Sequence, residues 1–165
     1  MQEKPCRAWF ADYPLSGRVL EVGSRNVNGT VRSFVPVTVG IDLVAGKGVD
    51  RVMDAAELPR HYPAGSFDAV VSVDALEHCA DWKGVVRGMW WCLKDGGTLA
   101  LSAAMPGKGR HDWPGDYWRF TGEDFRRIFS AQNIRDVRKL GCSTAVTVEK
   151  LSDDLDLGFE VAAVK

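Results

Sequence analysis

The strongest constraint on the fold of this sequence is a regular alternation of short apolar runs with amphipathic stretches. Continuous apolar runs of this length suit buried strands that are covered on both faces of a sheet. Five such runs are found at 18–24, 38–44, 49–53, 67–73 and 97–104. Two later runs, about 133–140 and 157–164, are predicted to form a terminal strand pair.

The clearest helix is predicted over 81–94, because its apolar residues recur at steps of three and four and form one stripe. Asp81 is well placed as the N-cap of this helix. Gly96 or Gly97 is expected to end it.

A second helix is predicted to begin at Thr121, which forms a capping-box-like pair with Asp124. Shorter helices are expected over 30–35, before Pro36, and over 6–13. Strands that alternate with helices imply βαβ crossovers and a largely parallel sheet. The sequence therefore predicts a doubly wound α/β fold, in which ligands bind at the carboxyl ends of the strands.

Length and composition predict one soluble domain over 1–165, since 45% of the residues are hydrophobic and 26% are charged. The net charge of −1 gives no overall basic surface for nucleic acid, and the basic residues between 126 and 139 are interpreted as a solvated face. No apolar stretch approaches the roughly 20 residues that cross a bilayer, and the N-terminus lacks the apolar run of a secretory signal. We therefore expect a cytoplasmic protein that binds neither nucleic acid nor membrane.

The cysteines and histidines show no spacing typical of a metal site. The four cysteines have no C-x-x-C pair, and the three histidines lie far apart in the sequence. These spacings predict no zinc or other metal site. A core of this size does not need disulfides, so a reduced environment is expected.

The loop after the first predicted strand is rich in small and polar residues. Gly23 would let the backbone approach a ligand closely. The loop is not G-x-G-x-x-G, because Arg25 and Asn28 stand where the second and third glycines would be. This departure disfavours a dinucleotide pyrophosphate and suits a ligand without one. A plain turn between strand and helix is the alternative.

Acids follow the next two predicted strands. Asp42 lies about twenty residues beyond the glycine loop, where doubly wound folds place an acid on ribose hydroxyls. Asp54 could accept a hydrogen bond from an exocyclic amine while the next backbone N–H donates to a ring nitrogen, and together they would recognise an adenine edge. The alternatives are a turn-forming role for Asp42 and an N-cap role for Asp54.

Ionisable residues also follow the run at 67–73, in the segment Asp74-Ala75-Leu76-Glu77-His78. A substrate should arrive at this end of the strand.

The segment 109–121, after the fifth run, is both polar and aromatic. It could form a wall of an acceptor pocket, with His111 or Asp116 near the acceptor atom. Its aromatic residues could instead pack on the helix that follows, and for Trp118 and Phe120 we favour this structural role.

Together these segments resemble the class I S-adenosylmethionine-dependent methyltransferases, and most closely the small bacterial type 11 methyltransferase-domain proteins. The matching stretches are, in order, 19–23, 40–42, 54–59, 67–78 and 93–99. Any one of them is common, but the ordered set over about 18–104 is specific. The resemblance implies a Rossmann-like, mostly parallel seven-stranded sheet with a C-terminal antiparallel hairpin, which 133–164 would supply.

The resemblance further implies S-adenosylmethionine as the cofactor. It places Glu21 and Gly23 at the methionine part, Asp42 at the ribose, Asp54 and Ala55 at the adenine, and Val73 and Asp74 near the sulfonium. Ser24, Arg25 and Leu43 are further predicted cofactor-binding residues.

Methyl transfer from a sulfonium is an in-line displacement with a neutral leaving group, so the enzyme must chiefly align the reactants. A base is needed only if the acceptor loses a proton. His78 and His111 are the candidate catalytic residues, because imidazole exchanges protons near neutral pH. Both could instead be structural.

The predicted acceptor is a small molecule. The sequence leaves little length for a substrate cap, so two alternatives stay open: a large acceptor on an open face, or a second subunit that completes the pocket in a homodimer. A non-catalytic S-adenosylmethionine-binding partner or sensor is the runner-up function. A nicotinamide oxidoreductase comes third, since G-x-G-x-x-G is missing.

Overall fold

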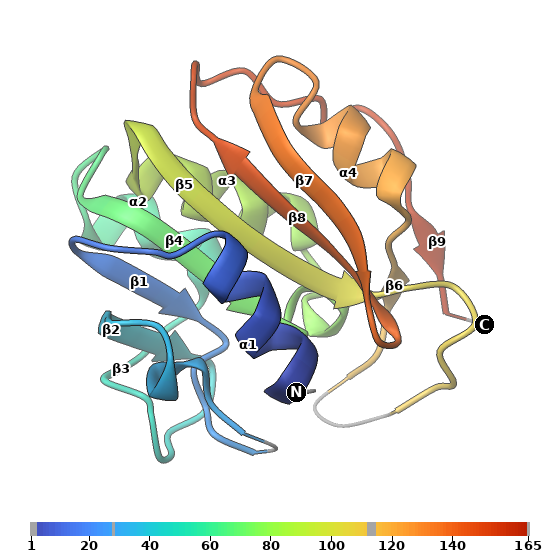
Figure 1. Ribbon diagram of the computed structural model, residues 1–165, viewed down its shortest axis with the longest axis horizontal. Helices are drawn as coiled ribbons and strands as arrows, with labels where there is room; N and C mark the ends of the chain where they lie inside the picture. The colour runs from blue at the N-terminus through green and yellow to red at the C-terminus, as the bar shows by residue number, and fades with distance from the viewer. Residues whose placement is uncertain (1–2, 28, 112–114, 165) are drawn as a thin grey trace.

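The computed structural model describes residues 3–27, 29–111 and 115–164. Within these ranges seven strands form the main sheet, in the spatial order β3-β2-β1-β4-β5-β8-β7 (Figure 1). The parallel strands are β1 (Val19–Val22), β2 (Val37–Asp42), β3 (Arg51–Val52), β4 (Phe67–Val73) and β5 (Leu93–Ala104). The strand order reverses between β1 and β4, so their carboxyl ends border the crevice where such sheets bind ligands.

Helices cover both faces of this sheet. Figure 1 shows α1 (Glu3–Asp12) in front of the sheet and α2 (Leu58–His61) and α3 (Trp82–Cys92) behind it. On the α1 face, Trp9 is fully buried and its indole N–H donates to Thr147 Oγ1 at 2.8 Å. The opposite face holds a larger core, to which α3 and α4 (Gly122–Ile128) contribute their apolar stripes. The predicted doubly wound architecture is therefore confirmed.

The predicted helix starts are confirmed in detail. The Asp81 side chain caps α3 by accepting from the Gly84 N–H at 2.9 Å. Thr121 and Asp124 form both halves of a capping box at the start of α4. The predicted end of the first of these helices is wrong, because α3 stops at Cys92 and β5 begins at Leu93, before either glycine.

Two other predicted elements are shorter than expected. The helix predicted over 30–35 is one 3-10 turn, η1 (Val31–Ser33), and the strand predicted over 49–53 is reduced to β3. At the N-terminus the helix expected over 6–13 is longer and begins at Glu3.

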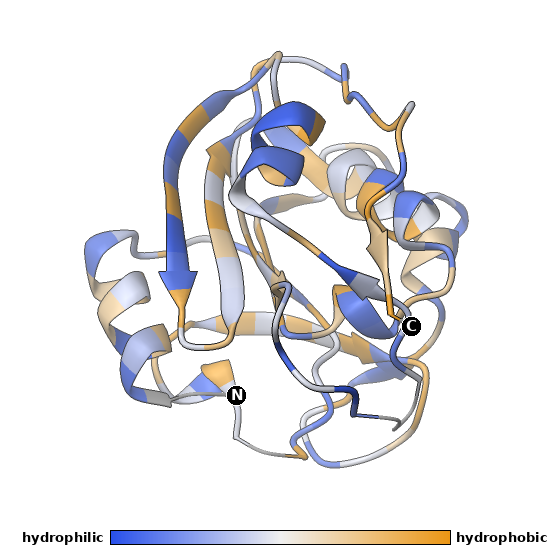
Figure 2. Cartoon of the chain, turned by 90° about the vertical axis from the view of Figure 1, so that its right-hand side faces the viewer, coloured by the Kyte–Doolittle hydropathy of each residue, from blue (hydrophilic) through white to orange (hydrophobic). Residues whose placement is uncertain are grey.

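One strand of the predicted terminal pair is confirmed, and its predicted partner is wrong. β7 (Asn133–Leu140) matches the first run, but its hairpin partner is β8 (Ser143–Glu149), which also pairs antiparallel with β5. Six of the seven β8 residues are buried because this strand lies between two others. Figure 2 shows the contrast with edge strand β7, which alternates between hydrophilic and hydrophobic residues.

The run at 157–164 contributes only the two-residue strand β9 (Ala162–Ala163). It pairs antiparallel with β6 (Trp118–Arg119) in a small second sheet. Two apolar residues of the run, Leu157 and Val161, join the core beside α3 and α4.

The basic residues between 126 and 139 are largely paired with acids. Arg127 binds Asp156 at 2.8 Å, and Arg135 binds Glu149 at 2.6 Å. This part of the surface is therefore mixed in charge. Over the described ranges, none of the helices has both the length and the apolar character that a membrane span requires.

Candidate cofactor and acceptor site

The glycine loop and the segment after β4 meet at the carboxyl ends of the two central strands. Gly23 follows β1 with a φ of +79°, which favours glycine. A Cβ added to Gly23 would lie 2.4 Å from the Cβ of Ala75. No side chain fits between the two segments, so this glycine permits a close approach.

Two buried oxygen atoms, one in β1 and one in the loop after it, have no hydrogen-bond partner among the described residues: Glu21 Oε2 and Ser24 Oγ. Glu21 is 6% exposed, and its carboxylate lies 3.6 Å from Arg32 Nε. Burial raises the pKa of Glu21 to about 7, and the attraction of Arg32 only partly opposes this. Buried polar groups without partners are uncommon, so these two atoms are candidates to bind a ligand.

Asp42 at the end of β2 ties the glycine loop to the next strand. Its carboxylate accepts from the backbone N–H of Arg25 at 3.1 Å and from that of Val44 at 3.0 Å. The Arg25 side chain packs over Gly46, since a Cβ on Gly46 would lie 3.0 Å from Arg25 Nε. Leu43, beside Asp42, is 56% exposed and leaves an apolar surface uncovered.

Asp54 has the N-cap role that was the alternative to cofactor binding. It accepts from the Ala56 N–H at 2.9 Å and caps η2 (Ala55–Glu57). This hydrogen bond uses Asp54 Oδ1, so the other carboxylate oxygen is not needed by the cap. Capping and ligand recognition are therefore compatible.

Asp74, directly after Val73, has a strained backbone. Its φ of +52° makes it the only non-glycine residue with positive φ in the described part of the chain. The Ser102 hydroxyl donates to Asp74 Oδ1 at 3.1 Å, and the Asp74 N–H donates to the Ser102 carbonyl, also at 3.1 Å. Such strain persists where surrounding contacts impose it, and it is concentrated at functional sites.

A second polar cluster lies just beyond, formed by Glu77, His78 and His111. The described residues on either side of 112–114 lie at this point, where the Tyr117 N–H donates to the Glu77 carbonyl at 2.9 Å. The centroids of the two imidazole rings lie 4.8 Å apart, with an edge-to-face angle of 81°. The fold thus brings together both predicted catalytic histidines.

Glu77 is the residue of this cluster that the sequence did not single out. Its side chain is 0% exposed, and neither carboxylate oxygen has a hydrogen-bond partner among the described residues. Burial, and then the nearby Asp74 charge, raise the pKa of Glu77 above its usual range. Glu77 lies in η3 (Leu76–His78), within the ionisable segment after β4, but its own role depends on burial and on contacts from distant residues.

His111 is positioned by Asp116, which itself forms a buried ion pair with Arg119. Its Nδ1 lies 3.1 Å from Asp116 Oδ2, and its backbone N–H donates to the same oxygen at 2.9 Å. Asp116 is held in turn by Arg119 through two hydrogen bonds of 2.5 and 2.7 Å. Those bonds hold the pKa of Asp116 well below its usual range, so the carboxylate stays ionised.

Trp118 and Phe120 have the structural roles favoured for them. Trp118 donates its indole N–H to the Cys79 carbonyl at 2.9 Å. Phe120 is fully buried and stacks on Phe125 with ring centroids 5.5 Å apart. Trp113 lies outside the described residues.

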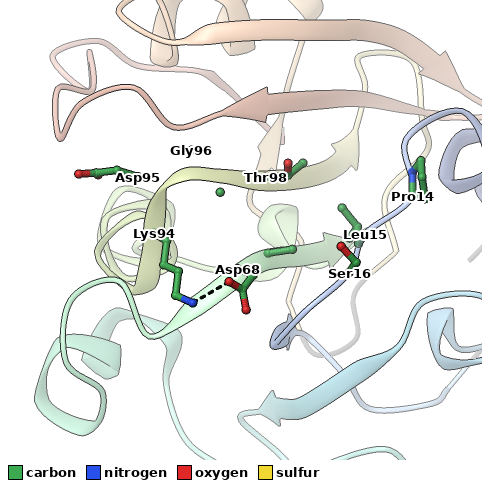
Figure 3. Close-up of a pocket in the computed structure, with 10 residues that line it drawn as sticks. Pro14, Leu15, Ser16, Asp68, Lys94, Asp95, Gly96 and Thr98 are labelled. Carbon is green, nitrogen blue, oxygen red and sulfur yellow. Dashed lines mark hydrogen bonds and ion pairs between the residues drawn. The ribbon is translucent and has the colours of Figure 1, made fainter.

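Of two pockets in the structure, one adjoins the histidine cluster and one does not. The pocket in Figure 3 lies where β4 begins, at the opposite end of the strand from the cluster, and contains the 2.6 Å ion pair of Asp68 with Lys94. The other pocket is lined by Gly115, Asp116, Tyr117 and Trp118 together with the segment of β9. Gly115 and Asp116 also contact the two histidines, so this second pocket borders the cluster.

Residues 20–101 match the model of the methyltransferase domain family. The chain belongs to this family. It is a class I S-adenosylmethionine-dependent methyltransferase, as the order of its motifs and strands predicted. A search among curated proteins found no match.

Solved structures with the same fold include enzymes of different activity. The Burkholderia thailandensis 1,6-didemethyltoxoflavin-N1-methyltransferase, with S-adenosylhomocysteine bound, is 15% identical with a TM-score of 0.68, over 90% of this chain and 78% of that one. A Thermotoga maritima protein described as a possible histamine N-methyltransferase is 14% identical with a TM-score of 0.64, over 87% of each chain. The [4+2]-cyclase SpnF is 15% identical with a TM-score of 0.65, over 88% and 80%. At these identities the likeness shows the fold alone.

The loops of this methyltransferase fit S-adenosylmethionine in three respects. The buried oxygens of Glu21 and Ser24 need donors, which the cationic amino group of that cofactor has. A Cβ at Gly23 would fill the close approach to Ala75. Exposed Leu43 beside Asp42 offers an apolar surface next to an acceptor of hydroxyl hydrogens.

Proposed function

We propose that this methyltransferase methylates a small molecule that enters by the pocket at 115–118 and reaches Glu77, His78 and His111. The supporting observation is that one segment, 74–78, contacts both polar regions. Gly23 approaches it from the cofactor loop, and Tyr117 binds it from the other side. A cofactor and an acceptor held by these two regions would meet at the end of β4.

In this proposal the methionine end of the cofactor lies against Glu21, Gly23 and Ser24. Its ammonium group would satisfy the unpartnered oxygens, and it would favour ionisation of Glu21 in a site where burial opposes it. Arg25 contributes through its backbone N–H, which orients the Asp42 carboxylate.

The nucleoside end would lie over the loops after β2 and β3. Asp42 has lone pairs left for the two ribose hydroxyls, and the exposed Leu43 would cover one face of the adenine. The free oxygen of Asp54 would accept from the adenine amine. The Ala55 N–H would donate to the ring, since the first turn of a helix does not use it.

Val73 and Asp74 would border the reacting atoms. When bound, the cofactor supplies a methyl group from its sulfonium and leaves as a neutral sulfide. The chain need only align the acceptor and, for an O–H or N–H acceptor, receive or release a proton. The bond from Ser102 and the imposed φ hold Asp74 in one geometry for this alignment.

His78 and His111 are the proposed catalytic residues. Each has its Nδ1 engaged, with the Gly115 carbonyl in one case and with Asp116 in the other. These contacts fix the orientation of both rings and leave Nε2 as the nitrogen that acts on the acceptor or on a group bound to it.

The direct test is turnover with methyl-labelled S-adenosylmethionine in whole-cell extract, which is then separated into small molecules, protein and nucleic acid, with labelled products followed by mass spectrometry. The proposal expects label in a small molecule and a rate about 100-fold lower for His111→Ala, the lower end of acid–base effects. His61→Ala is the matched control, since His61 is exposed on α2. Label found only in protein or nucleic acid would contradict the small-molecule acceptor. Cofactor binding without any transfer would favour a non-catalytic binding module.

A further inference from the structure

We infer that Glu77, His78 and His111 form a binding site for a divalent transition-metal ion. One donor atom from each residue lies within 4.8 Å of the others. This set could not be predicted from the sequence, because His78 and His111 are 33 positions apart and show no metal-ligand spacing. Contacts of His111, Gly115 and Tyr117 with η3 create it.

The unsatisfied carboxylate of Glu77 is the independent observation that points to a ligand. Both of its oxygens are buried and lack a hydrogen bond within the described ranges. The nearest ammonium, Lys108 Nζ, lies 3.6 Å from Oε1, beyond hydrogen-bond distance. A buried carboxylate without partners is costly, and a coordinated cation would remove that cost.

The two histidines have the outer-shell contacts of metal ligands. His78 Nδ1 contacts the Gly115 carbonyl, and His111 Nδ1 contacts the Asp116 carboxylate. Metal-binding histidines usually donate one ring N–H to a carbonyl or carboxylate in this way, which turns the other nitrogen toward the ion. His111 Nε2 lies 3.9 Å from Glu77 Oε1, so a small closing movement would bring both onto one ion.

The donor set selects the class of metal. Two imidazole nitrogens and one carboxylate oxygen suit Mn²⁺, Fe²⁺, Co²⁺, Ni²⁺ or Zn²⁺, whereas Mg²⁺ and Ca²⁺ prefer oxygen donors. Three protein ligands leave coordination positions open. The pocket at Gly115 and Asp116 adjoins them. The inference deepens the proposed function here and rests on it: an acceptor oxygen, from a hydroxyl or carboxylate, would fill an open position.

The charges around the cluster permit a cation. Asp74 adds a negative charge near Glu77, and Asp116 is neutralised by Arg119. The Lys108 ammonium lies 3.6 Å from Glu77, and the Lys108 side chain is 25% exposed, so it can turn outward. Lys108 should therefore compete with the metal, and Lys108→Met should tighten binding.

Titration of the full-length, cofactor-free protein with Co²⁺, followed by visible absorption, tests this inference. We expect saturable one-to-one binding. Affinity should fall at least about ten-fold in Glu77→Gln and His111→Ala, by analogy with losses at metal-site shells. It should rise in Lys108→Met and stay unchanged in His61→Ala. Circular dichroism establishes that each variant is folded.

A measurement on the wild-type protein covers the case in which a variant fails to fold. Paramagnetic Mn²⁺ should broaden the ring NMR signals of His78 and His111 and leave those of His61 sharp. Equal broadening of all three signals, or a thiolate–Co²⁺ charge-transfer band from the exposed Cys142, would overturn the site. Calorimetry with S-adenosylmethionine alone separates the two proposals: if the cofactor binds and turns over while Co²⁺ does not bind, only the metal site fails.

Discussion

The backbone N–H of Arg25 donates to the carboxylate of Asp42 at 3.1 Å, and this bond joins the glycine loop to the second strand. The contribution of Arg25 is therefore its main chain, while its side chain packs over Gly46. Arg25→Ala should leave S-adenosylmethionine affinity within about three-fold of wild type, less than 1 kcal/mol. Calorimetry measures it. A loss of ten-fold or more would mean that the guanidinium itself binds the cofactor.

Gly23→Ala should weaken both the fold and cofactor binding, because a Cβ there meets Ala75 at 2.4 Å with φ at +79°. The expected cost is about 1–3 kcal/mol in the free energy of unfolding. Gly96→Ala is the matched control, since its φ is +74° but no atom lies within 4 Å of the added Cβ. In chemical denaturation Gly23→Ala should lose more stability than the control. Ala75→Gly added to Gly23→Ala should recover part of the difference. Equal costs for the two alanine variants would argue against the close contact.

Because of Glu21, the free energy of unfolding should fall as the pH rises. Its pKa is raised to about 7 in the folded protein, from about 4.5 unfolded, so the folded state binds the proton more tightly. The stabilising effect is present below about pH 4.5 and is lost as pH rises through about 7, up to about 3 kcal/mol in total. Urea unfolding of wild type and Glu21→Gln at several pH values measures it. The difference between the two should change over this window and level off above it. Parallel profiles would show that folding does not raise the pKa of Glu21.

The four cysteines should differ sharply in reactivity. Cys142 is exposed in the turn between β7 and β8, whereas Cys6 and Cys92 are buried. Burial raises the pKa of Cys79 to about 12 and that of Cys92 to about 11, which suppresses their thiolates. A thiol reagent at mildly alkaline pH should label one site quickly, and Cys142→Ser should abolish that phase. A fast phase that survives this substitution would mean that the packing around another cysteine is looser than described.

The parallel half of the fold could be predicted because local patterns determine it. Apolar runs marked β1, β2, β4 and β5, and Asp81 and Thr121 marked helix starts through capping chemistry. The hairpin partner was mistaken because β8 mixes serine and threonine with valine, and its burial comes from its two neighbouring strands. The run at 157–164 looked more strand-like, yet its apolar side chains join the helix-side core.

The candidate site also contains some residues that could be predicted from the sequence and others that could not. Residues after strand ends, such as Asp42 and Asp74, could be found because the fold type fixes where ligands bind. The role of Glu77 could not, because it depends on burial and on the side chains of Lys108 and His111. The contact between His78 and His111 likewise arises only in the folded chain.

Calorimetric titration of S-adenosylmethionine into wild type, Asp42→Asn and Asp68→Asn tests the central claim most directly. Asp68 is the matched control, since its carboxylate also accepts from a backbone N–H, that of Arg18 at 2.7 Å, but at the opposite end of the strands. We predict binding to wild type and Asp68→Asn with equal affinity, and at least about ten-fold weaker binding to Asp42→Asn. Equal affinity for all three proteins, or no binding to wild type, would contradict a cofactor site at the carboxyl ends of these strands.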